Sequence, residues 1–339
     1  MSNTHLHPTK PIVANSNDLW VKPMTDYNNH SSYQAELNIL PCKLLNQQAK
    51  ELSTRFKHEF HIADFGCSHG KNSMECIKSA FDGYIGNPSF IRVYLNDLPS
   101  NDFGQVFKCL NDPAISINQH PLALKANIST CVNGLSFSNQ CFPSDHLHLS
   151  FSCNCLHWLE KPFILSRALF GKSPRVTPEE SHALAEDVHV QFVSFLKSRA
   201  QELKQGGRLV ASFLKGGPIL MEMEKNWLAY ITKMGHQMED FAEVALPIYY
   251  RSDAEVQRGL DQVQTEFRTL MMETYYDSKN GIDMHIYKSA TFGCLLSGLQ
   301  KTTLFTTTSE CEDFLHGFFN SFSFLYGTTI YHALVLERI

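Results

Sequence analysis

The chain lacks the features that mark several common classes of protein. No run of about 18 apolar residues occurs in its 339 residues, so we expect no membrane-spanning helix. No cluster of Lys and Arg stands out and the formal net charge is -5, which argues against a surface for nucleic acid or acidic membranes. Residues 1–10 are polar and lack the apolar stretch of a secretory signal. We therefore expect partners that are neither nucleic acids nor membranes.

Cysteine pairs and metal motifs are also missing. The ten cysteines form no C-x-x-C pair, and the sixteen histidines show no H-E-x-x-H or Cys/His zinc spacing. Reduced, mostly buried thiols explain this distribution better than a disulfide framework does, which favours a reducing compartment. The sequence thus predicts a cytoplasmic protein without a bound metal.

What the chain does contain is 43% apolar residues against 19% charged residues, which supports a sizeable core and argues against general disorder. Apolar runs alternate with helical patterns about five times, as is typical of an α/β fold with a doubly wound, Rossmann-like sheet. The expected strands are residues 61–65, 90–95, 128–132, 146–151, 208–214, 267–276 and 331–336. Thr177, Pro178 and Glu180 predict the start of a helix, which we expect to pass Leu203 and to stop at two glycines, 206 and 207.

Extra helical segments interrupt this order after the fourth and fifth expected strands. The length permits one large domain with insertions or two ordinary domains. We expect a single domain over residues 1–339, with helical cap insertions at about 159–200, 215–265 and 285–326. Trp227 and its apolar neighbours fit either a lid over a pocket or a core, and the core is the commoner arrangement. Trp227 is kept as a candidate substrate contact.

Residues 62–72, IADFGCSHGKN, read as a buried strand, a glycine turn and the start of a helix. Such a turn brings backbone N–H groups and a helix N-terminus close to a ligand. The stretch matches neither G-x-G-x-x-G nor the P-loop pattern, and Asp64 would repel a phosphate. A cationic, hydroxyl-bearing ligand such as S-adenosylmethionine (SAM) fits better, with Gly66 at the turn. A purely structural turn explains the stretch equally well.

Two further expected strands end in residues that suit a ligand. Asp97 follows the strand at 90–95, where an acidic residue commonly accepts hydrogen bonds from ribose hydroxyls. Its distance from the glycine turn exceeds the usual spacing of about 20 residues. His157 and Trp158 follow the strand at 146–151, at the sheet edge where open α/β folds bind ligands. A core position is the commoner alternative for this Trp.

An N-terminal segment adds a third group of polar residues. Tyr27, Ser31 and Gln34 have i, i+4 and i+7 spacing, so they share one face if the segment is helical. A polar helix surface is the alternative interpretation.

Several of these stretches coincide with one family. The motifs are IADFGCSHGKN at 62–72, VYLNDLPSNDF at 93–103, GLSFSNQCFP at 134–143, LHWL at 156–159, FLKSRAQELKQGGRLVASFL at 195–214 and LPIYYRSDAEV at 246–256. In this order they resemble the SABATH methyltransferases, SAM-dependent carboxyl methyltransferases best known from plants. Members of that family act on salicylic, benzoic, jasmonic and indoleacetic acids, and relatives methylate xanthine nitrogens.

The resemblance implies a role for each matching residue. The SAM-contacting positions are Ser31, Asp64, Asn72, Asp97, Leu98, Ser136 and Phe137. Asp97 would hold the ribose, Ser136 and Phe137 the adenine, and the remaining polar residues the methionine end. Gln34 and Trp158 match the pair that hydrogen-bonds the substrate carboxylate, with His157 beside the methyl acceptor.

The chain also departs from the family pattern. Asn154 replaces a pocket Tyr, His69 and Lys71 stand where small residues and Pro are usual, and His30 replaces an Asn. The glycine-rich lead before Tyr27 is missing. These departures leave the residues that the resemblance assigns to SAM binding in place. They put in question whether the substrates are the aromatic acids familiar from the family.

The resemblance implies an O-methyltransferase that forms the methyl ester of a small carboxylic acid. A carboxylate is already ionised at pH 7, so alignment by Gln34 and Trp158 suffices without a general base. An N–H or phenol acceptor, with His157 as base, and a protein that binds SAM without turnover remain alternatives. Members of the family are often dimers, so the resemblance also implies a homodimer.

Overall fold

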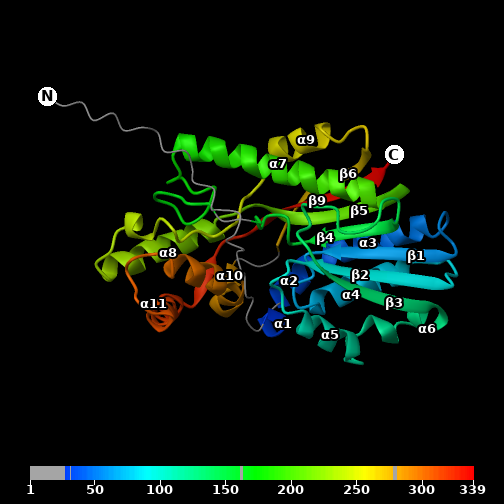
Figure 1. Cartoon of the computed structure of the whole chain (residues 1–339), viewed down its shortest axis with the longest axis horizontal. Helices are drawn as coiled ribbons and strands as arrows, with labels where there is room; N and C mark the ends of the chain where they lie inside the picture. Colours follow the sequence, from blue (N-terminus) through cyan, green and yellow to red (C-terminus); the bar gives the residue numbers. More distant parts are fainter. Residues whose placement is uncertain (1–26, 31, 161–162, 278–280) are drawn as a thin grey trace.

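The computed structural model (Figure 1) describes residues 27–30, 32–160, 163–277 and 281–339. Its seven-stranded sheet has the order β3-β2-β1-β4-β5-β9-β6. The strands are β1 (Glu59–Phe65), β2 (Phe90–Asp97), β3 (Asn127–Gly134), β4 (Leu147–Cys153), β5 (Leu203–Gly216), β6 (Phe267–Tyr276) and β9 (Ile330–Arg338). Strands β1 to β5 pair in parallel, whereas β9 is antiparallel to both neighbours. This arrangement confirms the predicted α/β, Rossmann-like fold class.

Helices cover both faces of the sheet. One face packs against α3 (Ile39–Leu52), α4 (Lys71–Gly83) and α5 (Phe103–Asn111), and the other against α7 (Pro178–Glu202) and α9 (Asp253–Asp261). Along β1, Ile62 points to the first core and Phe65 to the second. The central parallel strands β1 and β4 are buried on both faces, so their sequences read as nearly continuous apolar runs and were recognisable, whereas the edge strand β3 has no buried residue.

The start of α7 confirms the predicted capping box. The Thr177 side chain accepts a hydrogen bond from the Glu180 N–H at 3.2 Å, and the Glu180 carboxylate accepts one from the Thr177 N–H at 3.0 Å. The predicted end of the helix was wrong, because α7 ends at Glu202 and β5 begins at Leu203. Leu203 pairs with Leu147, and Gly206, at φ +74°, lies where the pairing with β4 shifts register. The two glycines therefore form an irregularity within the strand rather than a loop.

A cap lies beside the carboxyl edge of the sheet (Figure 1). It contains α8 (Ile219–Lys233), the 3-10 turn η2 (Met238–Phe241), α10 (Met284–Leu299), α11 (Thr308–Asn320) and a small sheet of β7 (Gly281–Asp283) and β8 (Phe324–Tyr326). Its core surrounds Trp227, whose ring lies 5.4 Å from Phe241 and 5.0 Å from Phe318. The expected cap insertions also included the segments that form α7 and α9, but these two helices pack against the sheet and are not part of the cap. The division into one domain stays a prediction.

Short helices complete the described chain. They are α1 (Tyr27–His30), α2 (Ser32–Leu37), η1 (Ile117–Gln119) and α6 (Pro121–Lys125). Among the described helices, none has the length and apolar character needed to cross a membrane. None of the ten cysteines forms a disulfide.

Candidate functional site

The turn after β1 is shaped by glycine. Gly66 has φ +96°, and a Cβ on it would lie 2.2 Å from the Cys155 sulfur. The N–H groups of Gly66 and Cys67 donate to the Asn96 carbonyl at 2.9 and 3.0 Å, which draws the turn across the end of β2. Gly70, at φ +92°, then begins α4. Only glycine permits both the backbone conformation and the close approach at position 66.

Two carboxylates lie where β1 and β2 end. Asp97 accepts hydrogen bonds from the Ser68 N–H at 2.6 Å and the Leu98 N–H at 2.8 Å, which fixes its orientation. Asp64 is only 4% exposed, and burial raises its pKa to about 7, with the nearby Asp97 charge adding to the increase. A cationic ligand would relieve both effects, because it favours the ionised carboxylates.

A large pocket opens above these strand ends, between the sheet and the cap, and a smaller cavity adjoins it. The predicted residues that line the large pocket are Gln34, Gly66, Asp97, Leu98, Ser136, Phe137, Asn154, His157 and Trp158. Asp64 and Asn72 line the smaller cavity, which shares Gln34, Gly66 and Asn154 with the large one. The structure therefore brings together residues that are up to 124 positions apart in the chain (Gln34 and Trp158).

Three predicted site residues are not part of this pocket as described. Trp227 is fully buried in the cap core and lines neither cavity. Ser31 lies outside the described residues, and Tyr27 lies in α1 but its side chain is not described.

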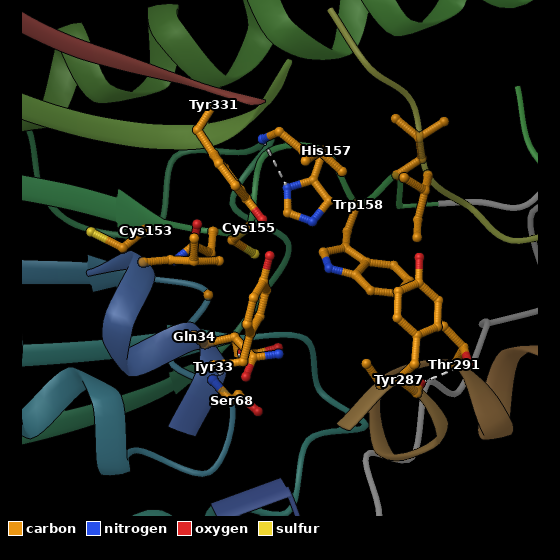
Figure 2. Close-up of a pocket in the computed structure, with 18 of the residues that line it drawn as sticks. Tyr33, Gln34, Ser68, Cys153, Cys155, His157, Trp158, Tyr287, Thr291 and Tyr331 are labelled. Atoms are coloured by element: carbon orange, nitrogen blue, oxygen red, sulfur yellow. Dashed lines mark hydrogen bonds between the residues drawn. The ribbon is translucent and has the colours of Figure 1, made fainter. Parts of the chain in front are cut away.

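Figure 2 shows the part of the pocket that contains His157 and Trp158. The Leu214 N–H donates to Nδ1 of His157 at 3.4 Å. Because a backbone N–H can only donate, Nδ1 acts as acceptor, and the neutral ring carries its proton on Nε2. The indole nitrogen of Trp158 lies on the side of its ring that faces Tyr33 and Gln34. The backbone at Trp158 is held in place by an isolated β-bridge to Ile248, which lies in the connection between η2 and α9.

Gln34 and Asn154 border both cavities. Each has a buried amide oxygen, Oε1 and Oδ1, without a hydrogen-bond partner in the described part of the chain. Asn154 has φ +56° and donates from Nδ2 to the Asn38 side chain at 2.7 Å. A ligand in the pocket could pair these oxygens, since buried polar atoms are rarely left unsatisfied.

The pocket wall contains a group of tyrosines that the sequence analysis missed: Tyr33, Tyr250, Tyr287 and Tyr331. Burial raises the pKa of all four, to about 12 for Tyr331, so their hydroxyls stay protonated. Aliphatic residues fill the spaces between them: Leu37, Leu214, Ile219, Ile248, Ile282 and Ile286. Among the lining residues that the structure describes, none is Lys or Arg.

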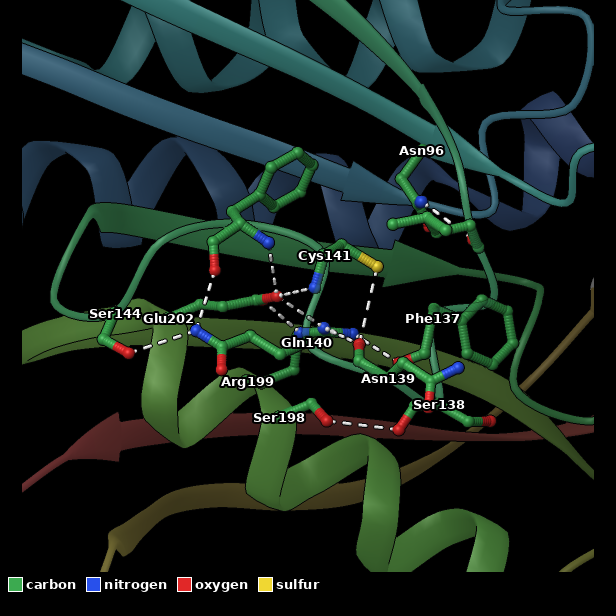
Figure 3. A network of polar contacts seen from close by, with 12 residues as sticks. Asn96, Phe137, Ser138, Asn139, Gln140, Cys141, Ser144, Ser198, Arg199 and Glu202 are labelled. Atoms are coloured by element: carbon green, nitrogen blue, oxygen red, sulfur yellow. Dashed lines mark hydrogen bonds and ion pairs between the residues drawn. The ribbon is translucent and has the colours of Figure 1, made fainter.

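A buried ion pair supports the loop that carries Ser136 and Phe137 (Figure 3). Arg199 and Glu202 are both 0% exposed and lie 2.7 Å apart. Arg199 also donates to the carbonyls of Phe137 and Asn139 at 2.7 and 2.9 Å. The sequence held one signal for this pair, namely opposite charges three residues apart within an apolar helix face, but the pair was not predicted from it.

The two departures in the glycine turn contact the N-terminal segment. Asn28 in α1 donates to the His69 carbonyl at 3.3 Å, and its own carbonyl accepts from the Lys71 ammonium at 3.1 Å. The altered loop therefore forms a contact with α1.

Comparisons with known proteins agree with this arrangement. Residues 22–302 match the family model of SAM dependent carboxyl methyltransferases. A probable jasmonic acid carboxyl methyltransferase 2 from Theobroma cacao is 34% identical over 212 residues, 56% of this chain and 56% of the relative. A 3,7-dimethylxanthine N-methyltransferase 2 from Coffea arabica is 28% identical over 290 residues, 74% of this chain and 72% of the relative.

The matched part thus spans little more than half the length of the Theobroma relative. Among solved structures, loganic acid methyltransferase with SAH has the same fold, with a TM-score of 0.71 and 20% identity over 93% of this chain and 98% of that chain. The family match covers most of the sequence and confirms the resemblance drawn from the motifs, and we conclude that the chain belongs to the SAM-dependent carboxyl methyltransferase family.

Proposed function

We propose that the chain is a SAM-dependent O-methyltransferase that forms the methyl ester of a small carboxylic acid. Family membership supports the cofactor and the reaction class. The relatives include both carboxyl and N-methyltransferases, so only the pocket can indicate the acceptor of this chain.

The buried carboxylates fit SAM. Burial raises the pKa of Asp64 to about 7, so a positively charged ligand in the adjoining cavity favours its ionised form. In our proposal Asp97 binds the ribose hydroxyls, Ser136 and Phe137 border the adenine, and Asp64 and Asn72 hold the methionine end. Ser31, outside the described residues, belongs to the same proposed set.

When bound, SAM supplies a methyl group on a positively charged sulfur, a leaving group that needs no further activation. The protein must orient the acceptor and exclude water, and such positioning can lower a barrier by about 7–11 kcal/mol in favourable cases. The apolar and tyrosine-rich wall of the pocket would exclude water.

The tautomer of His157 is the observation that indicates which kind of group accepts the methyl. Its Nδ1 accepts from the Leu214 N–H, so Nε2 bears the proton and donates rather than removing a proton from the substrate. A phenol or N–H acceptor generally needs a base, whereas a carboxylate is ionised at neutral pH. The pocket thus favours an acceptor that is already an anion.

Neutral donors would hold that anion. The Gln34 amide, the Trp158 indole N–H and His157 Nε2–H can each donate to a carboxylate oxygen. With no Lys or Arg among the described lining residues, a single carboxylate on a mostly apolar body fits better than a dianion. Asn154 and Tyr27 remain proposed substrate contacts, whereas Trp227 lies in the cap core and does not line the pocket.

The test is transfer from radiolabelled SAM to a pool of salicylic, benzoic, jasmonic and indoleacetic acids, followed by organic extraction and base treatment. Base-labile extractable label is the expected result. Base-stable label would favour a nitrogen or phenol acceptor, and SAM binding without transfer to any acceptor would favour a non-catalytic protein.

A Trp158→Phe variant tests the orienting role. The ring stays and one N–H donor is lost, so kcat/KM for the acid should fall about tenfold or more while SAM affinity stays unchanged. An unchanged kcat/KM would contradict the proposed role. Rates at saturating SAM, which keeps Asp64 ionised, that are flat between pH 6 and 9 would further support a carboxylate acceptor, which titrates near pH 4.

We further propose a cytoplasmic location and a homodimer. The ten free cysteines support a reducing compartment. Fluorescent-fusion imaging tests the location, and light scattering of the full chain tests the assembly.

A further inference from the structure

We propose that Tyr33 is a positioning residue, whose hydroxyl ties α2 to the ends of β6 and β9 and thereby holds the Gln34 amide toward the acceptor. The inference rests on the proposed function, because it concerns the orientation of Gln34. It adds a residue that acts through Gln34 rather than on the substrate itself.

The tie consists of three residues from distant parts of the chain. The Tyr33 hydroxyl donates to Oδ2 of Asp277 at 2.6 Å and lies 2.7 Å from the hydroxyl oxygen of Thr329. The Thr329 N–H donates to the same Asp277 oxygen at 3.0 Å, and its hydroxyl also contacts that oxygen. Tyr33 and Thr329 are each 4% exposed, so water competes little for these bonds.

The element that carries Gln34 needs such support. Helix α2 has only six residues, Ser32–Leu37, and a helix of that length is not stable without tertiary contacts. Just after its end, Asn38 accepts a hydrogen bond from Asn154 at 2.7 Å, which fixes the connection to α3. Tyr33 holds the N-terminal part of α2 in place. If the Tyr33 tie is lost, α2 can pivot about Asn38 and displace Gln34.

The hydroxyl of Tyr33 and its ring have separate roles. The ring lines the pocket, and Figure 2 shows the hydroxyl end pointing toward that of Tyr331, away from Gln34. Tyr33→Phe therefore keeps the ring in the pocket wall and removes the contacts of the hydroxyl with Asp277, Thr329 and Tyr331. Asp277 keeps its two donors from Thr329, so the variant leaves no buried carboxylate without a partner.

The first experiment compares Tyr33→Phe with the unaltered chain. We expect the acceptor KM, measured with the pooled acid that is esterified fastest, to rise by about five- to tenfold. The dissociation constant of SAM should change less than the acceptor KM does, because Asp64, Asp97 and Asn72 lie on β1, β2 and α4, which take no part in the tie. Amide hydrogen exchange of residues 32–37 should become faster.

The matched control is Tyr230→Phe. The Tyr230 hydroxyl donates to the Phe314 carbonyl at 3.1 Å within the cap, outside the pocket lining. Like Tyr33→Phe, this variant removes one tyrosine hydroxyl and keeps the ring, but the acceptor KM and the exchange of residues 32–37 should not change. A similar KM increase in both variants would overturn the proposal, since it would indicate a general loss of stability.

A double-mutant cycle with Gln34→Ala separates positioning from structure. If Tyr33 acts through Gln34, adding Tyr33→Phe to Gln34→Ala should raise the acceptor KM by less than about twofold. If the full increase persists in the Gln34→Ala background, the proposed route through Gln34 is wrong.

Hydrogen exchange distinguishes a failure of this inference from a failure of the proposed function. Should no acid in the pool be esterified, the proposed function fails, but the exchange of residues 32–37 still reports the tie. Unchanged exchange in Tyr33→Phe overturns the inference whether or not the chain has activity.

Discussion

Replacing Arg199 with Met tests how much the cofactor loop depends on the buried ion pair. The guanidinium group is 0% exposed, contacts Glu202 at 2.7 Å, and donates to the carbonyls of Phe137 and Asn139. Removing one partner of such a pair leaves the other charge uncompensated, which costs about 3–5 kcal/mol. Methionine keeps much of the side-chain length but makes none of these polar contacts.

The lower part of that range is expected here. Glu202 keeps hydrogen bonds from the backbone N–H groups of Cys141 and Phe142, so its charge is not left without donors. We predict that Arg199→Met lowers the free energy of unfolding by about 3 kcal/mol. SAM should also bind more weakly, because the loop at 136–139 loses its anchor. Urea unfolding at pH 7 and isothermal titration calorimetry measure the two effects.

Arg258→Met is the matched control for this prediction. Arg258 pairs with Glu186 at 2.7 Å, the same distance as in the buried pair, but the two side chains are 48% and 47% exposed. Solvent screening makes exposed pairs weak, so this variant should not measurably change stability or SAM binding. If Arg199→Met were no more destabilising than Arg258→Met, the argument from burial would be refuted.

Two further predictions concern the sheet and the glycine turn. His148 is fully buried at the start of β4, and burial lowers its pKa to about 3. Because the unfolded chain binds the proton near pH 6.5, this contribution to stability is complete above that pH and is lost as the pH falls toward 3. The contribution of His148 falls by about 2 kcal/mol between pH 7 and pH 5. It is measured as the difference in urea unfolding between the unaltered chain and His148→Gln, because Asp64, whose pKa burial raises to about 7, changes stability in the opposite direction over the same range. His148→Gln should flatten this dependence and exposed His58→Gln should not; an unchanged slope in His148→Gln would contradict the assignment. Gly66→Ala should abolish SAM binding in calorimetry, because the new Cβ would lie 2.2 Å from the Cys155 sulfur and the backbone has φ +96°. Binding that survived the change would mean that the turn is not constrained as described.

Local sequence patterns predicted the helices and strands and, through the motifs, the family. Apolar runs located the strands because parallel strands are buried on both faces, and Thr177 with Glu180 located the start of α7 because a capping box needs only four consecutive residues. The glycine turn and Asp97 stand at strand ends that the alternating order already implied. Each of these signals lies within a few neighbouring residues.

Features that depend on partners far apart in the sequence arise only in the tertiary structure. Gly206 and Gly207 resemble a helix stop, but pairing between β4 and β5 places them inside a strand. Trp227 has the same local pattern in a lid or in a core, and only the packing of α8 against α11 assigns it to the core. Tyr33 meets Asp277 and Thr329 across separations of 244 and 296 residues. No local pattern encodes such contacts, because they arise only when the sheet brings the ends of α2, β6 and β9 to the same edge.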